Sequence, residues 1–159
     1  MPSDSSPIPA QDRAGVIRRM QILAGVSERT IDRIAAQSRA LDVDEGDVLY
    51  AVGDPARSVY VIDSGRLRFT LGADGRPAAS GSIIRPGDIL GWAALLADQP
   101  RRIATVAALE PSRLLEIEGR RLLEALEEDP HAGFLVMHRL ARMITQSFLE
   151  QSSMLNSVT

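Results

Sequence analysis

The residues best suited to binding chemistry lie close together, between Gly91 and Thr105. Gly91 begins a run of small and apolar residues that predicts a short helix, and Arg101 and Arg102 follow a loop that contains Pro100. The first turn of a helix leaves backbone N–H groups without partners, so it favours an anion. An arginine at the head of the next strand adds a bidentate, charge-assisted contact to a phosphate. The segment therefore predicts an anion-binding site.

The N–H groups in this prediction belong to Trp92, Ala93 and Ala94, and the small alanine side chains let a ligand approach the backbone. Neighbouring arginines on one strand point to opposite faces. Only one of Arg101 and Arg102 is therefore expected to enter a pocket. The alternative for this pair is a solvent-facing arginine beside an arginine in a structural salt bridge.

Residue types that other chemistries require are absent or scarce. The 159-residue chain has no cysteine, which excludes disulfides, thiolate zinc sites and cysteine nucleophiles. Its two histidines, His131 and His138, lack the clustered ligands of a metal-dependent enzyme built on a β-barrel. No serine–histidine–aspartate pattern or glycine-rich nucleotide loop of an enzyme is visible. We therefore expect a protein that is not an enzyme and requires no cofactor.

The composition is that of one globular domain, with 45% hydrophobic and 25% charged residues. A formal net charge of −3 argues against a protein that coats nucleic acid. No apolar run approaches the ~20 residues that cross a bilayer. Residues 1–11 lack a signal-peptide pattern and are predicted to be a disordered leader. We expect a cytoplasmic domain over residues 12–159 that binds neither DNA nor a membrane.

The elements that position the site are predicted from two successive patterns, helical spacing first and strand-like runs after it. Residues 12–40 show helical spacing, with Ser27 placed as an N-cap. Residues 41–118 contain short β-branched and aromatic runs, separated by turns such as those at Gly46 and Gly65. Strands about ten residues apart predict a small all-β sandwich or barrel, including strands at 102–108 and 113–118.

Residues 119–154 are predicted to form two helices, the second of which begins at Pro130. The second helix carries two neighbouring apolar stripes. One comprises Phe134, Met137, Ala141, Ile144, Phe148 and Leu155, and the other Val136, Leu140, Met143 and Ser147. One stripe can cover the β-domain, and a coiled-coil-like pairing with a second copy is the simplest partner for the other. A helix with one wider buried face is the alternative.

Two phrases of the sequence resemble the cyclic nucleotide-binding domain family. "EGDVLYAVGDPARSVYVIDSGRLRF" resembles the opening strands of that family, and "RPGDILGWAALLADQPRRIATVAALEPSRLLEIEGRRL" resembles its phosphate-binding cassette and the following strands. The resemblance covers about residues 15–150 and is nearest to sensor domains of bacterial catabolite activator and fumarate–nitrate regulators. It implies an eight-stranded jelly-roll β-barrel with N-terminal helices, a long C-terminal helix and a cassette over residues 87–106.

The resemblance also assigns roles within the cassette. The order Arg102, Ile103, Ala104 and Thr105 makes Arg102 the better match for the phosphate-binding arginine, although Ile103 is bulkier than usual. The alternative, Arg101, directly follows the loop. Trp92 stands where the family usually has a glutamate that accepts a hydrogen bond from the ribose 2′-hydroxyl. An indole N–H only donates, so this contact to cyclic AMP or cyclic GMP is lost.

The resemblance implies that the long helix closes on the base, near Met143, Ser147 and Phe148, and that ligand binding moves it. The sequence ends at Thr159 without a helix-turn-helix domain. We therefore expect a stand-alone regulatory domain that senses a cyclic nucleotide or another small anion. It would signal to a protein partner and form a homodimer through the C-terminal helix. The alternatives are a ligand-free dimerisation module and a truncated transcription regulator.

Overall fold

The computed structural model describes residues 10–70, 82–96, 98 and 100–156. Its helices and 3₁₀ turns are α1 (Ala10–Arg18), η1 (Gln21–Leu23), α2 (Glu28–Ala36), η2 (Trp92–Leu95), α3 (Gly119–Glu128) and α4 (Pro130–Asn156). Its strands are β1 (Ser38–Val43), β2 (Val48–Tyr50), β3 (Ser58–Ser64), β4 (Leu67–Thr70), β5 (Ser82–Ile84), β6 (Ile89–Leu90), β7 (Thr105–Ala108) and β8 (Ser112–Glu118). Helices therefore flank a central β region on both sides in sequence.

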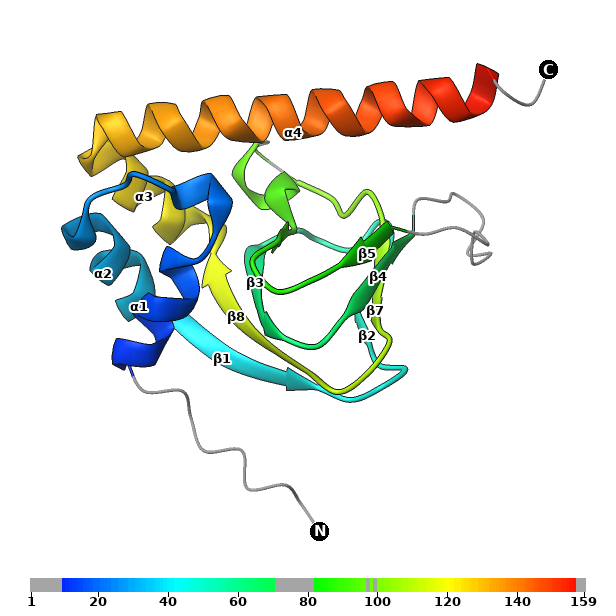
Figure 1. Cartoon of the computed structure of the whole chain (residues 1–159), viewed down its shortest axis with the longest axis horizontal. Coiled ribbons are helices and arrows are strands. Elements are labelled where there is room, and N and C mark those ends of the chain that lie inside the picture. The colour runs from blue at the N-terminus through cyan, green and yellow to red at the C-terminus, as the bar shows by residue number, and fades with distance from the viewer. Residues whose placement is uncertain (1–9, 71–81, 97, 99, 157–159) are drawn as a thin grey trace, which may run out of the picture.

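The strands form two antiparallel sheets, ordered β1-β8-β3-β6 and β2-β7-β4-β5. Figure 1 shows the sheets beside each other, with α1, α2 and α3 gathered at one end and α4 along one side. The predicted jelly-roll class is confirmed. The described strands pair as two separate sheets, however, and no hydrogen-bonded ladder between those sheets closes them into a barrel.

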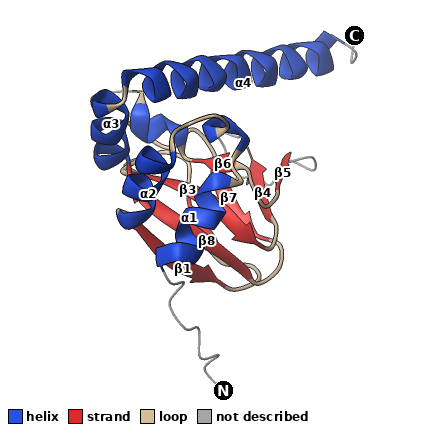
Figure 2. Ribbon diagram, turned by 60° about the vertical axis from the view of Figure 1, so that its left-hand side comes forward, coloured by secondary structure: helices blue, strands red, loops and turns tan. Residues whose placement is uncertain are grey.

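The central strand β3 is buried on both faces, which explains its nearly continuous apolar sequence. Val59 and Val61 pack in a cluster with α1, α2, α3 and α4. Tyr60 and Ile62, which alternate with them, belong to a second cluster between the sheets. The period of two along a strand therefore divides the core into a helical layer and an inter-sheet layer. Figure 2 shows α1 and α2 lying over the sheet that contains β1 and β8.

α2 begins where the sequence places its cap. The Ser27 hydroxyl accepts a hydrogen bond from the Thr30 N–H at 3.4 Å. The helical region predicted over residues 12–40 is interrupted and ends early, because α1 stops at Arg18, a 3₁₀ turn takes up residues 21–23 and β1 already begins at Ser38. Of the predicted leader, residues 1–9 lie outside the described residues, and α1 already begins at Ala10.

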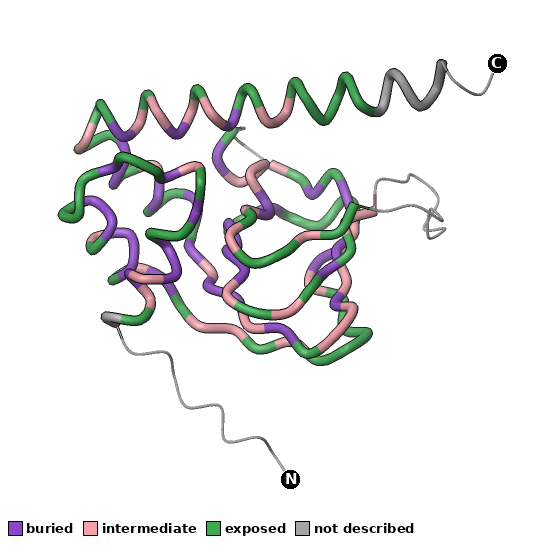
Figure 3. The backbone as a smooth tube through the Cα atoms, in the orientation of Figure 1, coloured by how far each residue is buried: buried purple, intermediate pink, exposed green. Residues whose placement is uncertain are grey.

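α4 packs through one face against the helical layer and extends beyond it (Figure 1). Val136 and Leu140 are buried, and Met137, Met143 and Ile144 pack against the same cluster. The buried face therefore combines members of the two stripes distinguished in the sequence. Figure 3 shows burial alternating along the first half of α4 and giving way to exposure further along.

Candidate functional site

The cassette, residues 87–106, is shaped by a glycine that tertiary contacts require. Gly91 joins β6 to η2 with a φ of 80°, which L side chains rarely adopt. A Cβ at this position would lie 2.5 Å from Arg102 Nη1 and 2.8 Å from the Ser58 carbonyl oxygen. Gly91 therefore permits both the turn and the close approach of an arginine.

Arg102 is the cassette arginine that lies in the interior. It is 5% exposed, and its guanidinium donates to the Ser58 carbonyl at 2.9 Å and to the Gly91 carbonyl at 3.3 Å. Its Nε is buried and has no hydrogen-bond partner among the described residues. A buried donor without a partner is costly. The guanidinium therefore retains a donor that no described residue uses.

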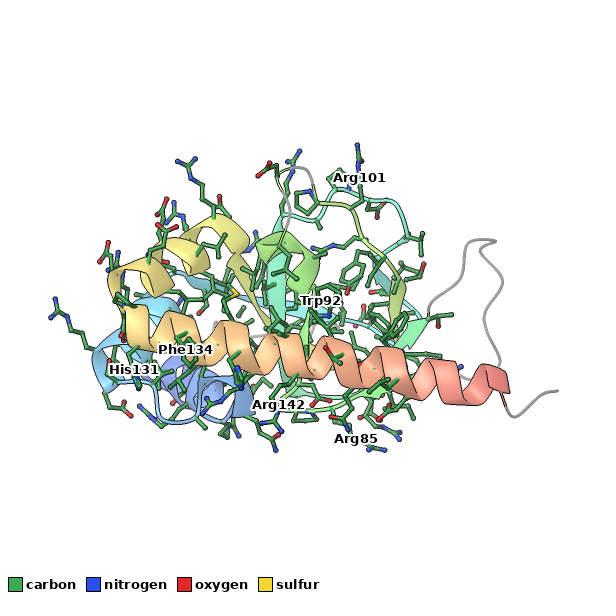
Figure 4. All side chains as sticks on the ribbon, turned by 90° about the horizontal axis from the view of Figure 1, so that it is seen from above. Arg85, Trp92, Arg101, His131, Phe134 and Arg142 are labelled. Carbon is green, nitrogen blue, oxygen red and sulfur yellow. The ribbon has the colours of Figure 1, made fainter. Side chains whose placement is uncertain are left out.

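Arg101 lies on the outside. It is exposed and donates to the Gly53 carbonyl at 3.3 Å, and its backbone forms an isolated bridge with Pro55. Figure 4 shows Arg101 pointing away from the body of the molecule. The predicted strand from 102 begins only at Thr105, so loop geometry rather than strand alternation separates the two arginines.

Two tyrosines that the sequence analysis did not single out surround Arg102. The guanidinium carbon lies 4.2 Å from the ring centroid of Tyr50 and 5.5 Å from that of Tyr60. Burial raises the pKa of Tyr50 to about 12 against the opposing effect of the Arg102 charge, and burial also raises the pKa of Tyr60, assisted by Glu116. Both phenols therefore stay neutral at physiological pH. The one feature of the sequence that could have drawn attention to them is that the chain contains only these two tyrosines.

Trp92 points toward the helices rather than into the inter-sheet core. Its side chain is partly buried and packs against the cluster formed by α1, α2, α3 and α4. Figure 4 shows it beside α4. The residue in the family's glutamate position therefore connects η2 with the helical layer.

The predicted helix at the cassette is a 3₁₀ turn, which leaves fewer backbone N–H groups without partners than expected. The Ala94 N–H donates to the Gly91 carbonyl at 3.0 Å, so the expectation that it is free is wrong. A 3₁₀ turn closes its bonds one residue earlier than an α-helix does, and this satisfies the third N–H group. Ala93 and Ala94 are partly buried, and a Cβ on Gly119 of α3 would lie 2.7 Å from the Ala94 carbonyl oxygen.

The residues after Arg102 have different environments. Ile103 is 47% exposed, whereas Ala104 is fully buried. The Thr105 hydroxyl accepts a hydrogen bond from the Val52 N–H at 3.1 Å, which fixes the neighbouring loop. The structure thus gathers Gly91, Ala104 and Arg102 in the interior and leaves Ile103 at the surface.

The α4 residues named in the sequence analysis pack with the helical layer, bond to their own helix or face solvent. Met143 is partly buried in the helical cluster. The exposed Ser147 hydroxyl donates to the Met143 carbonyl of its own helix at 3.0 Å, and Phe148 is 68% exposed. His138 stacks on the exposed ring of Phe134, with centroids 5.7 Å apart.

Within residues 10–70, 82–96, 98 and 100–156, no group of three or more histidine and acidic side chains is arranged to hold a metal ion. None of the helices in these ranges has the length and apolar character needed to span a bilayer.

A family model and several curated proteins match parts of this sequence. The family model described as cyclic nucleotide-binding domain matches residues 41–129, more than half of the chain. The acetyltransferase Pat of Mycolicibacterium smegmatis is 39% identical over 100 residues, which cover 62% of this chain and 29% of that protein. The chain therefore spans less than a third of this curated relative's length.

Solved structures show the same fold at low sequence identity. The sensor domain of the transcriptional regulator DNR from Pseudomonas aeruginosa aligns with a TM-score of 0.72 and 19% identity over 89% of this chain and 94% of that one. The regulatory domain of Toxoplasma gondii PKA with cAMP aligns with a TM-score of 0.73 and 17% identity over 86% of this chain and 50% of that one.

Proposed function

The chain belongs to the cyclic nucleotide-binding domain family, and from that premise we propose that it is a regulatory domain that binds a cyclic nucleotide or another small anion at Arg102. The single observation that carries this proposal is the buried guanidinium with an unpartnered Nε. A phosphate oxygen accepts from such a group in a charge-assisted hydrogen bond. The Toxoplasma gondii regulatory domain with cAMP supports a cyclic nucleotide as the first ligand to test.

Trp92 broadens the range of ligands within this proposal. A carboxylate in its place would accept a hydrogen bond from a ribose hydroxyl, whereas an indole cannot. A lost charge-assisted hydrogen bond costs about 1.5–3 kcal/mol, or roughly ten- to a hundredfold in affinity. We therefore expect cyclic AMP and cyclic GMP to bind weakly, and an anion without a ribose to be penalised less.

The proposed signal passes from the cassette to α4. Trp92 and Ala94 place η2 against the helical layer, and Gly119 allows the start of α3 to approach Ala94 closely. Gly133 of α4 in turn lies close to the Leu126 carbonyl of α3, where an added Cβ would be 2.9 Å away. A shift of η2 therefore displaces tightly packed neighbours, and ligand binding would select between two packings of these helices.

We also propose that α4 pairs with a second copy of the chain. Phe134 and Phe148 are each 68% exposed on its outer face, with His138, Ala141 and Thr145 at alternating steps of three and four residues between them. That spacing is typical of a coiled-coil seam. A double Phe134→Ser, Phe148→Ser variant should be monomeric by analytical ultracentrifugation, and a wild-type protein that is already monomeric would contradict the pairing.

Because Pat is named as an acetyltransferase and this chain spans only part of it, we propose that the domain regulates a partner and is not itself the enzyme. We place it in the cytoplasm with that partner. The second candidate function, a ligand-free dimerisation module, is favoured by the exposed face of α4. It would retain dimerisation and show no ligand response.

Thermal unfolding with added ligand separates the two functions. Cyclic AMP, cyclic GMP and inorganic phosphate should each be titrated to millimolar concentration, and a ligand that binds the folded state raises Tm by mass action. Arg102→Ala should abolish the rise, whereas Arg101→Ala, the matched surface control, should keep it. No shift with any of these ligands would reject anion sensing and leave the dimerisation module.

A further inference from the structure

The Arg102 charge is held in the interior without an acidic partner. Its guanidinium hydrogen bonds go to the neutral carbonyls of Ser58 and Gly91. In the described part of the chain, the ion pairs join other arginines to acidic residues and do not include Arg102. Burying an unpaired charge is expensive. Some other feature must therefore offset the desolvation of this side chain.

Aromatic ring faces supply that feature. Both tyrosine centroids lie within the ~6 Å over which a cation is attracted to a ring face, at 4.2 Å for Tyr50 and 5.5 Å for Tyr60. The two rings are 6.0 Å apart, and each residue is 8% exposed, so little water screens the attraction.

The alternative way to hold this arginine, a carboxylate, would have a different consequence. A carboxylate neutralises the guanidinium and competes with an incoming anion for the same N–H groups. A ring face attracts the cation but accepts no strong hydrogen bond from it. The rings therefore stabilise the positive charge of Arg102 without accepting from its Nε, which is buried and has no partner among the described residues.

We propose that Tyr50 and Tyr60 are positioning residues of the anion site, whose ring faces replace an acidic counterion so that the bound anion supplies the full negative charge. This inference rests on the proposed function for its ligand. The arrangement of the ligand-free site does not depend on that ligand, so it can be tested separately.

The test compares Tyr50→Phe, which keeps the ring, with Tyr50→Met, which fills similar space without one. Leu67→Met changes packing in the same inter-sheet cluster and serves as the control. Cyclic AMP and inorganic phosphate are titrated by calorimetry at constant ionic strength. We expect Tyr50→Met to weaken binding about tenfold, and Tyr50→Phe and Leu67→Met to change it less than threefold.

The Nε–Hε NMR signal of Arg102, assigned by its loss in Arg102→Lys, reports on the ligand-free site. Ring currents should displace this signal in wild type and Tyr50→Phe, and Tyr50→Met should return it toward the position of the exposed arginines. If neither probe binds wild type but the Arg102 signal shifts only where the ring at position 50 is lost, the anion-sensing proposal fails and the rings are still shown to hold Arg102. An Arg102 signal or affinity that is unchanged in folded Tyr50→Met would overturn the positioning role.

Discussion

The Arg102 site and the distal part of α4, residues 145–150, are the two regions through which we propose that the protein works, and they are stabilised in opposite ways. Arg102 contacts β2, β3 and the Gly91 turn, which are separate segments of the sequence. In residues 145–150 every side chain is exposed, and the Thr145 and Ser147 hydroxyls bond to carbonyls of their own helix. The difference implies that tertiary packing fixes the Arg102 site, whereas residues 145–150 keep apolar side chains exposed.

The largest effect should come from comparing the inner and outer faces of α4. Leu140 is 1% exposed in the helical cluster, so Leu140→Ala should lower the free energy of unfolding by about 2–5 kcal/mol. Phe148→Ala should cost within about 0.5 kcal/mol in dilute protein, because Phe148 contacts mainly solvent. Urea unfolding at several protein concentrations measures both, and equal losses would contradict the division between the faces.

The next effect concerns the Gly91 turn, for which Gly53 is a matched control. Both glycines have positive φ, 80° and 87°, but only Gly91 has neighbours that an added Cβ would strike. Alanine at either position should cost about 1–2 kcal/mol in backbone strain. Gly91→Ala should cost about 1–3 kcal/mol more through overpacking against Arg102 and Ser58. Equal unfolding free energies would show that the turn, and not the arginine, determines the need for glycine.

A smaller effect should appear at alkaline pH. The chain has no lysine or cysteine, so its two tyrosines are the side chains that titrate near pH 10–12. The folded pKa of Tyr50 is raised to about 12, so its stabilising contribution is present below the unfolded pKa near 10 and is lost as pH rises toward 12. Between pH 9 and 12, the free energy of unfolding of Tyr50→Phe should therefore fall by up to about 2 kcal/mol less than that of wild type. Ultraviolet phenolate absorbance gives the pKa directly, and ordinary titration of both tyrosines would argue that Tyr50 is not buried.

The smallest effect is expected at Asp129, which joins α3 to α4. Its carboxylate accepts from the Thr30 hydroxyl at 2.6 Å and from the Ala132 N–H at 3.2 Å, and these bonds lower its pKa. A lowered folded pKa gives stability that is present above the unfolded pKa and is lost as pH falls through the folded value. Asp129→Asn should be slightly less stable than wild type at pH 7 and equal to it in strong acid. Thermal melts across pH 2–7 test this, and a difference independent of pH would point to geometry instead of charge.

The sequence predicted much of the fold because local patterns and global packing agree there. Ser27 caps α2 as expected, Pro130 begins α4, and glycines occupy the turns at Gly46 and Gly65 with positive φ. Patterns of spacing were less informative where several faces of an element are buried. The stripes drawn on α4 are mixed in its buried face, because Met137 and Ile144 pack beside Val136 and Leu140.

At the candidate site, the sequence by itself determined the residue types: a glycine before a short turn, a tryptophan without acceptor capacity, and arginines after the loop. Only the tertiary structure decided that Arg102 is inside and Arg101 outside, since the loop conformation and the pairing with residues 53–56 set their directions. It likewise brought Tyr50 and Tyr60 to Arg102 from separate sheets. Such contacts depend on how the sheets pack together, and no local propensity along the chain encodes that distance.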